Sequence, residues 1–309
     1  MHGSRGLRPL GIHSAEIRAS GPPPKHCSVG ECLGSWCQER GHVLIALHSY
    51  FDGSYSGKSW REGNFVTLAG YAAEDSIWSN FATDWKRILG DDRVRPKAAY
   101  LHMKEAAHLE GIFSWRNGWK LGKVKTLVTD LLLYLQTLDK KRFHQFACSI
   151  DLKAYRTLLA EGWRIPDPVD LCNGYCPEGA LVWYLGAYPG VIDAAHFFFD
   201  ASEPFKDPFE SLWKQEKQSL SLRPIADEWQ IIKSVSTTEM KDRPALQASD
   251  LLAWASNRVL TVPKDSFGAD LEPAMKQIIP SSWVVFDGKR FREELAFAYP
   301  CWRATVVRK

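Results

Sequence analysis

Two acidic residues each follow an apolar run in this chain. Asp52 ends the run 43–51 and precedes Gly53, and Asp200 ends the run 194–199. Both runs are rich in β-branched or aromatic residues, which is typical of buried strands, so each carboxylate is expected at a strand end. An Asp before Gly is also a common turn residue that hydrogen-bonds its own loop. Two strand-end acids favour a metal site more than either does alone.

Asp250 is unusual for a different reason. It lies in a mainly apolar helical segment, where Leu246 and Ala253 share its helical face, so its carboxylate is expected to point toward the core. A buried ionised carboxylate needs a cation, a metal or hydrogen-bond donors. The alternative to a metal is an ion pair with Arg243 or Arg258, or a capping role for a neighbouring element.

Converging carboxylates repel one another, and a divalent cation removes that repulsion. Mg²⁺ is held by a few carboxylates together with water and phosphate oxygens. Glu105 could complete a site formed by Asp52, Asp200 and Asp250, and His102 could serve as a ligand or a general base. The alternative is that Glu105 faces solvent at the start of a helix, where it suits the helix dipole. Glu203, three residues after Asp200, has the same two interpretations, a metal ligand or a solvent-facing acid.

Periodicity outlines the elements that would position these residues. Strands are expected at about 43–52, 64–73, 143–150, 194–200 and 229–236. Helices are expected at about 75–89, 123–138, 152–159, 178–185, 208–217 and 244–260. The first two strands are expected to form a hairpin. Alternating strands and helices predict an α/β fold.

The chain of 309 residues is expected to form one large domain. Residues 1–41 are rich in Gly, Pro, Ser and charge, which predicts a poorly ordered extension. A single domain is expected over 42–309, with a helical insertion around 152–190.

The extension contains Cys27, Cys32 and Cys37, with His26 and His42 nearby. Structural zinc usually draws on more closely spaced pairs, so free thiols are favoured over a zinc site. Seven cysteines spread over this length do not resemble a disulfide framework.

The composition fits a globular protein, with 45% hydrophobic and 24% charged residues. No apolar run approaches the length of a membrane span, and no secretory signal is recognisable, so a cytoplasmic location is expected. The net charge of +3 is too small to argue for nucleic acid by itself. Several loop residues are nevertheless candidates for contacts with a phosphate backbone, although for each one singly a solvated surface of mixed charge is the favoured alternative: Arg93, Arg95, Lys97, Lys140, Lys141 and Arg142. The 13 tryptophans offer stacking platforms, although most are expected in the core.

The order of these features resembles the DUF3800 family. A strand leads into Asp52-Gly53-Ser54-Tyr55-Ser56-Gly57; a hairpin strand, a helix, a Leu-His segment and a second strand ending in Asp follow, and then Leu-Gln-x-x-Asp-Leu-Leu over residues 246–252. The resemblance covers roughly residues 43–260, and the segment 246–252 is its most specific part. The family usually has an acid directly after the first Asp, as Asp-Glu-Ser-Gly, whereas this chain has Gly53.

The resemblance implies a ribonuclease-H-like fold, which is a mixed central sheet flanked by helices with helical elaborations. It also implies a metal-dependent, nuclease-like site. The leading hypothesis is a Mg²⁺- or Mn²⁺-dependent phosphodiesterase acting on DNA or RNA, with Asp52, Asp200, Asp250 and Glu105 as metal ligands and His102 assisting. The first alternative is a catalytically inactive module that binds nucleic acid or protein, for example in a defence-type assembly or as a homodimer. A hydrolase of small phosphate esters is a further alternative.

Overall fold

The computed structural model describes most of the chain after its first 44 residues. The described ranges are 45–55, 61–163, 165–188, 192–201, 203–219, 230–261, 267–280 and 283–298. The predicted extension over 1–41, and with it Cys27, Cys32 and Cys37, lies outside these ranges.

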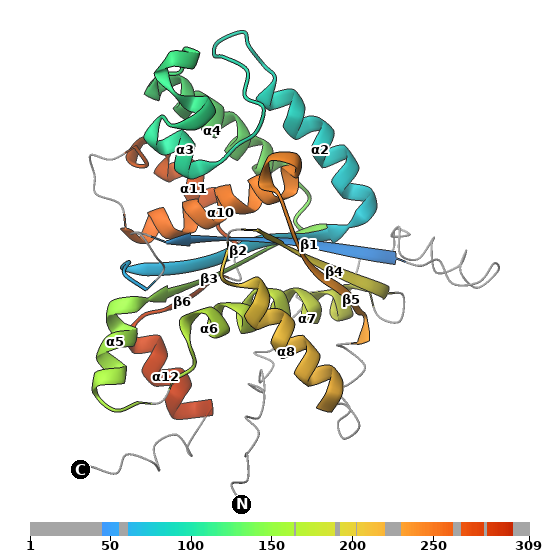
Figure 1. Ribbon diagram of the computed structural model, residues 1–309, viewed down its shortest axis with the longest axis vertical. Helices are drawn as coiled ribbons and strands as arrows, with labels where there is room; N and C mark the ends of the chain where they lie inside the picture. The colour runs from blue at the N-terminus through green and yellow to red at the C-terminus, as the bar shows by residue number, and fades with distance from the viewer. Residues whose placement is uncertain are drawn as a thin grey trace, which may run out of the picture.

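A six-stranded mixed sheet forms the centre of the molecule (Figure 1). The strands lie in the order β5-β4-β1-β2-β3-β6 across the sheet. Their bounds are β1 (Ile45–Tyr55), β2 (Phe65–Glu74), β3 (Phe143–Asp151), β4 (Ile192–Asp200), β5 (Ile232–Thr238) and β6 (Val284–Phe286). β2 pairs antiparallel with both β1 and β3, and the pairs β1–β4, β4–β5 and β3–β6 are parallel. Within this sheet, β2 alone therefore runs against the other strands.

Helices cover both faces of the sheet, which gives three layers (Figure 1). One face carries α2 (Asp75–Leu89), α3 (Met103–His108), α4 (Leu121–Thr137), α10 (Pro244–Thr261) and α11 (Glu272–Ile278). The other carries α5 (Leu152–Ala160), α6 (Pro168–Tyr175), α7 (Pro177–Ala187), α8 (Lys206–Ser219) and α12 (Gly288–Ala298). The expected α/β class with a helix-flanked sheet is therefore confirmed. The predicted insertion, 152–190, holds α5, α6 and α7, which contribute to the second face.

Side-chain periodicity explains the layers. α2 buries Trp78, Phe81, Trp85 and Leu89, which recur every three or four residues and so form one apolar stripe. Successive residues of a strand point to opposite faces of the sheet. On β1, Tyr50 packs in the core beneath α2, α4 and α10, whereas Phe51 packs in the core beneath α6, α7 and α8. Each face of the sheet thus has its own hydrophobic core.

The sequence-based boundaries differ from the structure in two informative places. β1 was expected to end at Asp52, but it continues to Tyr55, because the hairpin partner β2 keeps pairing as far as the Tyr55–Val66 register. Asp52 is therefore a strand residue and not a turn residue. The second difference is β6, which has only three residues and was not predicted.

In the part of the chain described here, no helix combines the length and the apolar character that crossing a bilayer would require.

Candidate functional site

Asp52 and Asp200 lie on adjacent strands at the same level of the sheet. β1 and β4 are parallel, and Phe51 is paired with Phe199. The next residue on each strand is the aspartate, and it points to the opposite face from its Phe neighbour, toward the layer that contains α10. Asp52 is 2% exposed and Asp200 is 9% exposed. The structure therefore brings these two predicted site residues together.

Asp250 reaches the same region from the helix that crosses above β1. It is buried, and its Oδ2 accepts a hydrogen bond of 2.6 Å from the backbone N–H of Met103. The alternative ion pairs do not form in the described residues, where no salt bridge joins Asp250 to Arg243 or Arg258. The Arg258 guanidinium instead lies 5.8 Å from the ring centre of Trp254. The carboxylate instead accepts from Met103, the first residue of α3, which is the alternative of a capping role for a neighbouring element.

Two side chains fix α10 above β1 on either side of Asp52. The Ser249 hydroxyl donates to the Tyr50 carbonyl at 2.8 Å, and the Asn257 amide donates to the Ser54 carbonyl at 3.2 Å. Both carbonyls are two residues from Asp52 along the strand. Because α10 is tied to the strand on both sides of the aspartate, Asp250 is held over Asp52.

Glu203 belongs to the same cluster, although the sequence alone left its role open. Its backbone N–H donates to the Asp200 carbonyl at 3.3 Å, which turns the chain back over the end of β4. The carboxylate lies directly over Gly53: a Cβ on that glycine would sit 2.3 Å from Glu203 Oε2. The signal in the sequence was the three-residue spacing from Asp200, which is too weak without the turn geometry.

Electrostatic effects show that the four carboxylates act on one another. Burial raises the pKa of Asp52 well above its usual range, and the negative charges of Glu203, Asp250 and Asp200 raise it further. Burial followed by the charges of Asp200 and Asp250 raises the pKa of Glu203 to about 8. Burial likewise raises the pKa of Asp250 to about 6, against an opposing effect of nearby His102. The four groups form one buried, mutually repelling cluster.

His102 and Glu105 border this cluster on the side of Asp250. His102 precedes α3, and its Nδ1 lies 3.4 Å from Glu105 Oε1. Glu105 Oε2 accepts a hydrogen bond of 2.8 Å from the Tyr100 hydroxyl. The charges of both residues affect the pKa of Asp250, with His102 lowering it and Glu105 raising it. They therefore lie near one member of the cluster, and both side chains are partly exposed, 35% and 21%.

The cluster does not form a ready-made ligand set. Among the residues that the structure describes, no three His, Cys, Asp or Glu side chains are arranged to hold a metal ion. The three aspartates are thus not already placed to share one metal ion, and their side chains would have to rotate toward one another to do so. The donors nevertheless fit Mg²⁺ or Mn²⁺, because all are carboxylate oxygens. Moreover, Glu203 Oε2 is buried and has no hydrogen-bond partner among the described residues.

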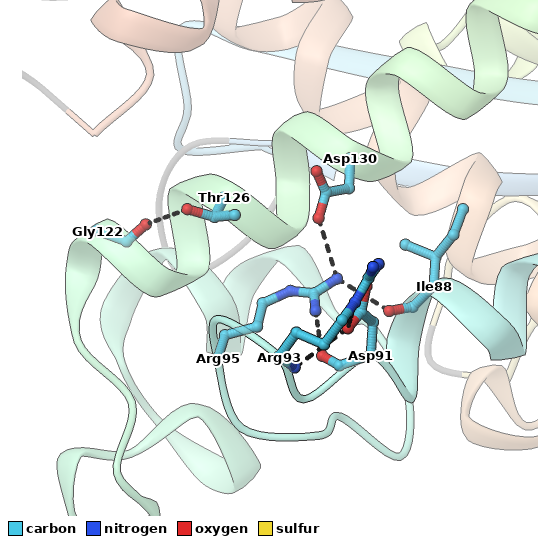
Figure 2. Close-up of polar contacts among 7 residues, drawn as sticks. All are labelled: Ile88, Asp91, Arg93, Arg95, Gly122, Thr126 and Asp130. Carbon is cyan, nitrogen blue, oxygen red and sulfur yellow. Dashed lines mark hydrogen bonds and ion pairs between the residues drawn. The ribbon is translucent and has the colours of Figure 1, made fainter.

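One predicted phosphate contact is wrong, because Arg95 is a buried structural residue. Its side chain is 1% exposed and donates to the Ile88 carbonyl at 2.9 Å and to the Asp91 carbonyl, and it pairs with Asp130 at 3.2 Å (Figure 2). These bonds tie the loop after α2 to α4. Burial therefore removes this guanidinium from any surface contact, whereas Arg93 beside it is 85% exposed.

The exposed loop cations are largely paired with neighbouring acids. Arg93 bonds Asp91, as Figure 2 shows, and Lys97 lies 3.2 Å from Asp92. The tryptophans divide as expected: Trp85 and Trp119 are almost completely buried. Trp115 differs from these two residues, because 72% of its surface is accessible to solvent.

A comparison with protein-family models finds no match to this chain, and no curated protein matches its sequence.

Proposed function

We propose that this chain is a Mg²⁺- or Mn²⁺-dependent phosphodiesterase that acts on nucleic acid. The observation that carries the proposal is the buried cluster of Asp52, Asp200 and Asp250. Carboxylates brought together out of water repel one another and cost free energy, unless a cation or a proton compensates them. In the described part of the chain, neither Asp52 nor Asp250 forms an ion pair with a Lys or Arg.

In this proposal the three aspartates hold one or two divalent ions, which when bound activate a water molecule and stabilise the leaving oxygen of a phosphodiester. β1, β4 and α10 supply the aspartates from rigid elements, which favours reproducible ligand positions. His102 is partly exposed beside Asp250 and can accept or deliver a proton at Nε2. Glu105 holds His102 and Tyr100 and completes the site on that side.

The proposal includes a ribonuclease-H-like fold and a relationship with the DUF3800 family. The support is the mixed sheet with helices on both faces and β2 as its one reversed strand in the described residues. The aspartate of the Leu-Gln-x-x-Asp-Leu-Leu segment, Asp250, carries a charge that raises the pKa of Asp52, which supports the shared site that the resemblance implies.

The test uses the purified full chain with end-labelled single- and double-stranded DNA and RNA, in Mg²⁺, in Mn²⁺ and in a chelator. We expect metal-dependent cleavage that falls at least a hundredfold in Asp52→Asn and in Asp250→Asn. Asp84→Asn is the matched control, because Asp84 is a surface acid paired with Arg87 on α2.

Two results would overturn the proposal. If no nucleic acid is cut and both site variants bind Mn²⁺ as the wild type does, the acids are structural and a binding module is the better description. If a generic aryl phosphate is hydrolysed while polymers are untouched, the substrate is a small phosphate ester.

A further inference from the structure

Gly53 and Glu203 occupy complementary positions. Gly53 follows Asp52 on β1 and has no side chain, and the volume above it is filled from two sides. A Cβ there would lie 2.3 Å from Glu203 Oε2 and 2.6 Å from the ring of Phe205. Cβ atoms essentially never lie closer than 3.0 Å to another heavy atom, so any larger residue at position 53 must displace the Glu203 carboxylate and the Phe205 ring.

The backbone around Glu203 is anchored on both sides. The Phe205 side chain is completely buried, and its carbonyl accepts a hydrogen bond of 3.0 Å from the Asn173 amide on α6. On the other side, the Glu203 N–H bonds the Asp200 carbonyl. The fold therefore holds the carboxylate against Gly53, the neighbour of Asp52, and a glycine at position 53 is what makes room for it.

A structural role would require donors for this carboxylate. Buried Glu203 Oε2 accepts no hydrogen bond from any described residue, and the charges nearest to the side chain are those of other acids, Asp52, Asp200 and Asp250. Leaving a buried acceptor unsatisfied costs about 1–3 kcal/mol, and more for a charged group. The arrangement costs stability in the metal-free chain and suits a group that binds a cation.

We infer that Glu203 is a fourth metal-binding carboxylate of this site and that it fills the volume beside Gly53 that a side chain at position 53 would otherwise take. The inference rests on the proposed function and deepens it, because it assigns a ligand outside the three strand and helix aspartates.

The experiment measures Mn²⁺ binding to the full chain by calorimetry without nucleic acid, and cleavage separately. We expect Glu203→Gln to weaken Mn²⁺ binding at least tenfold while the variant remains folded, because the amide has the same shape but replaces the carboxylate oxygens that would bind the cation. Glu210→Gln is the matched control: Glu210 lies on the next helix and is paired with Lys206 and Lys214. Its Mn²⁺ affinity should equal that of the wild type.

Gly53→Ala provides the reciprocal variant, since its Cβ must push the Glu203 carboxylate away. If it folds, it should also bind Mn²⁺ more weakly; if it does not fold, Glu203→Gln still decides the question. Wild-type Mn²⁺ affinity in Glu203→Gln, with affinity lost in Asp52→Asn, would overturn this inference alone. Unchanged affinity in Asp52→Asn and Asp250→Asn as well, or no Mn²⁺ binding by the wild type, would overturn the proposed site as a whole.

Discussion

The side-chain carbonyl of Gln247 accepts a hydrogen bond of 2.9 Å from the indole N–H of Trp85, joining α10 to α2 in the core. The same oxygen accepts the Leu101 N–H at 3.0 Å, and the Gln247 amide donates to the Met240 carbonyl at 3.0 Å. One buried side chain thus links four segments around the acid cluster, with both ends of its amide satisfied.

Replacing Gln247 with Leu should therefore destabilise the fold by about 2–4 kcal/mol, because it leaves the Trp85 and Leu101 donors buried without an acceptor. Urea unfolding followed by tryptophan fluorescence measures the change. Gln215→Leu, at an exposed position of α8, should change the free energy of unfolding by less than about 0.5 kcal/mol. Equal effects of the two variants would contradict the assigned role.

Asp250→Asn should stabilise the metal-free protein at neutral pH, by on the order of 1–2 kcal/mol. Burial and the neighbouring acids raise the pKa of Asp250 to about 6, so its ionisation at pH 7 opposes folding. The Asn oxygen can still accept the Met103 N–H. Thermal unfolding in a chelator measures the effect, and Asp130→Asn should have the opposite sign, because Asp130 pairs with buried Arg95. A less stable Asp250→Asn variant would argue for a structural acid.

The stability of the metal-free chain should fall as pH rises toward about 8 because of Glu203. Its pKa is raised from 4.5 to about 8 in the fold, so the folded state holds a proton that the unfolded state has lost. The contribution is complete below pH 4.5 and is lost as pH rises through the folded pKa. His48, His144 and His196 have lowered pKa values and act in the opposite sense below about pH 6.5.

The difference between wild type and Glu203→Gln isolates the effect. Urea unfolding in a chelator between about pH 6.5 and 8.5 should show a steeper decline for the wild type. Parallel curves for the two proteins would show that Glu203 keeps an ordinary pKa.

Truncation to Ala should destabilise the fold at Arg95 but not at Arg93, although the two residues are only two positions apart. Arg95→Ala should cost about 2–4 kcal/mol, because the Ile88 and Asp91 carbonyls and Asp130 lose a buried donor. Arg93→Ala should leave the melting temperature essentially unchanged, since the Arg93 side chain is 85% exposed and its ion pair with Asp91 is a surface pair. Thermal denaturation of both variants makes the comparison, and similar melting temperatures would be inconsistent with the burial of Arg95.

Trp115→Ala should weaken binding of a single-stranded oligonucleotide about fivefold or more, because an exposed indole is a stacking surface for bases. The Arg116 guanidinium lies 5.6 Å from the ring centre and adds a positive charge there. Fluorescence anisotropy in a chelator measures binding without cleavage. Leu133→Ala on α4 is the control, as Leu133 is also an exposed apolar residue, 52% accessible. Equal affinities for both variants would exclude Trp115 from the binding surface.

Sequence patterns predicted the long elements of the fold because alternation and helical spacing report burial directly. Asp200 was assigned to a strand end on that basis, and β4 does end there. Patterns failed where a tertiary contact decides the outcome. Pairing with β2 extends β1 past Asp52, and a turn that no local signal marks carries Glu203 over Gly53. Arg95 lies in a loop of mixed charge, and a loop has no regular spacing of buried residues from which its burial could be predicted.

The two hydrogen bonds that tie α10 to β1 also require equal distances between their anchor residues on the helix and on the strand. Ser249 and Asn257 are eight residues apart, which is about 12 Å along a helix. Their acceptors on Tyr50 and Ser54 are four residues apart, which is about 13 Å along a strand. The two lengths agree only at this ratio of residues, so inserting one residue between the anchors of either element breaks the match. An insertion or deletion within 50–54 or 249–257 is therefore expected to change the spacing of Asp52 and Asp250, whereas a change of length elsewhere leaves these anchors in place.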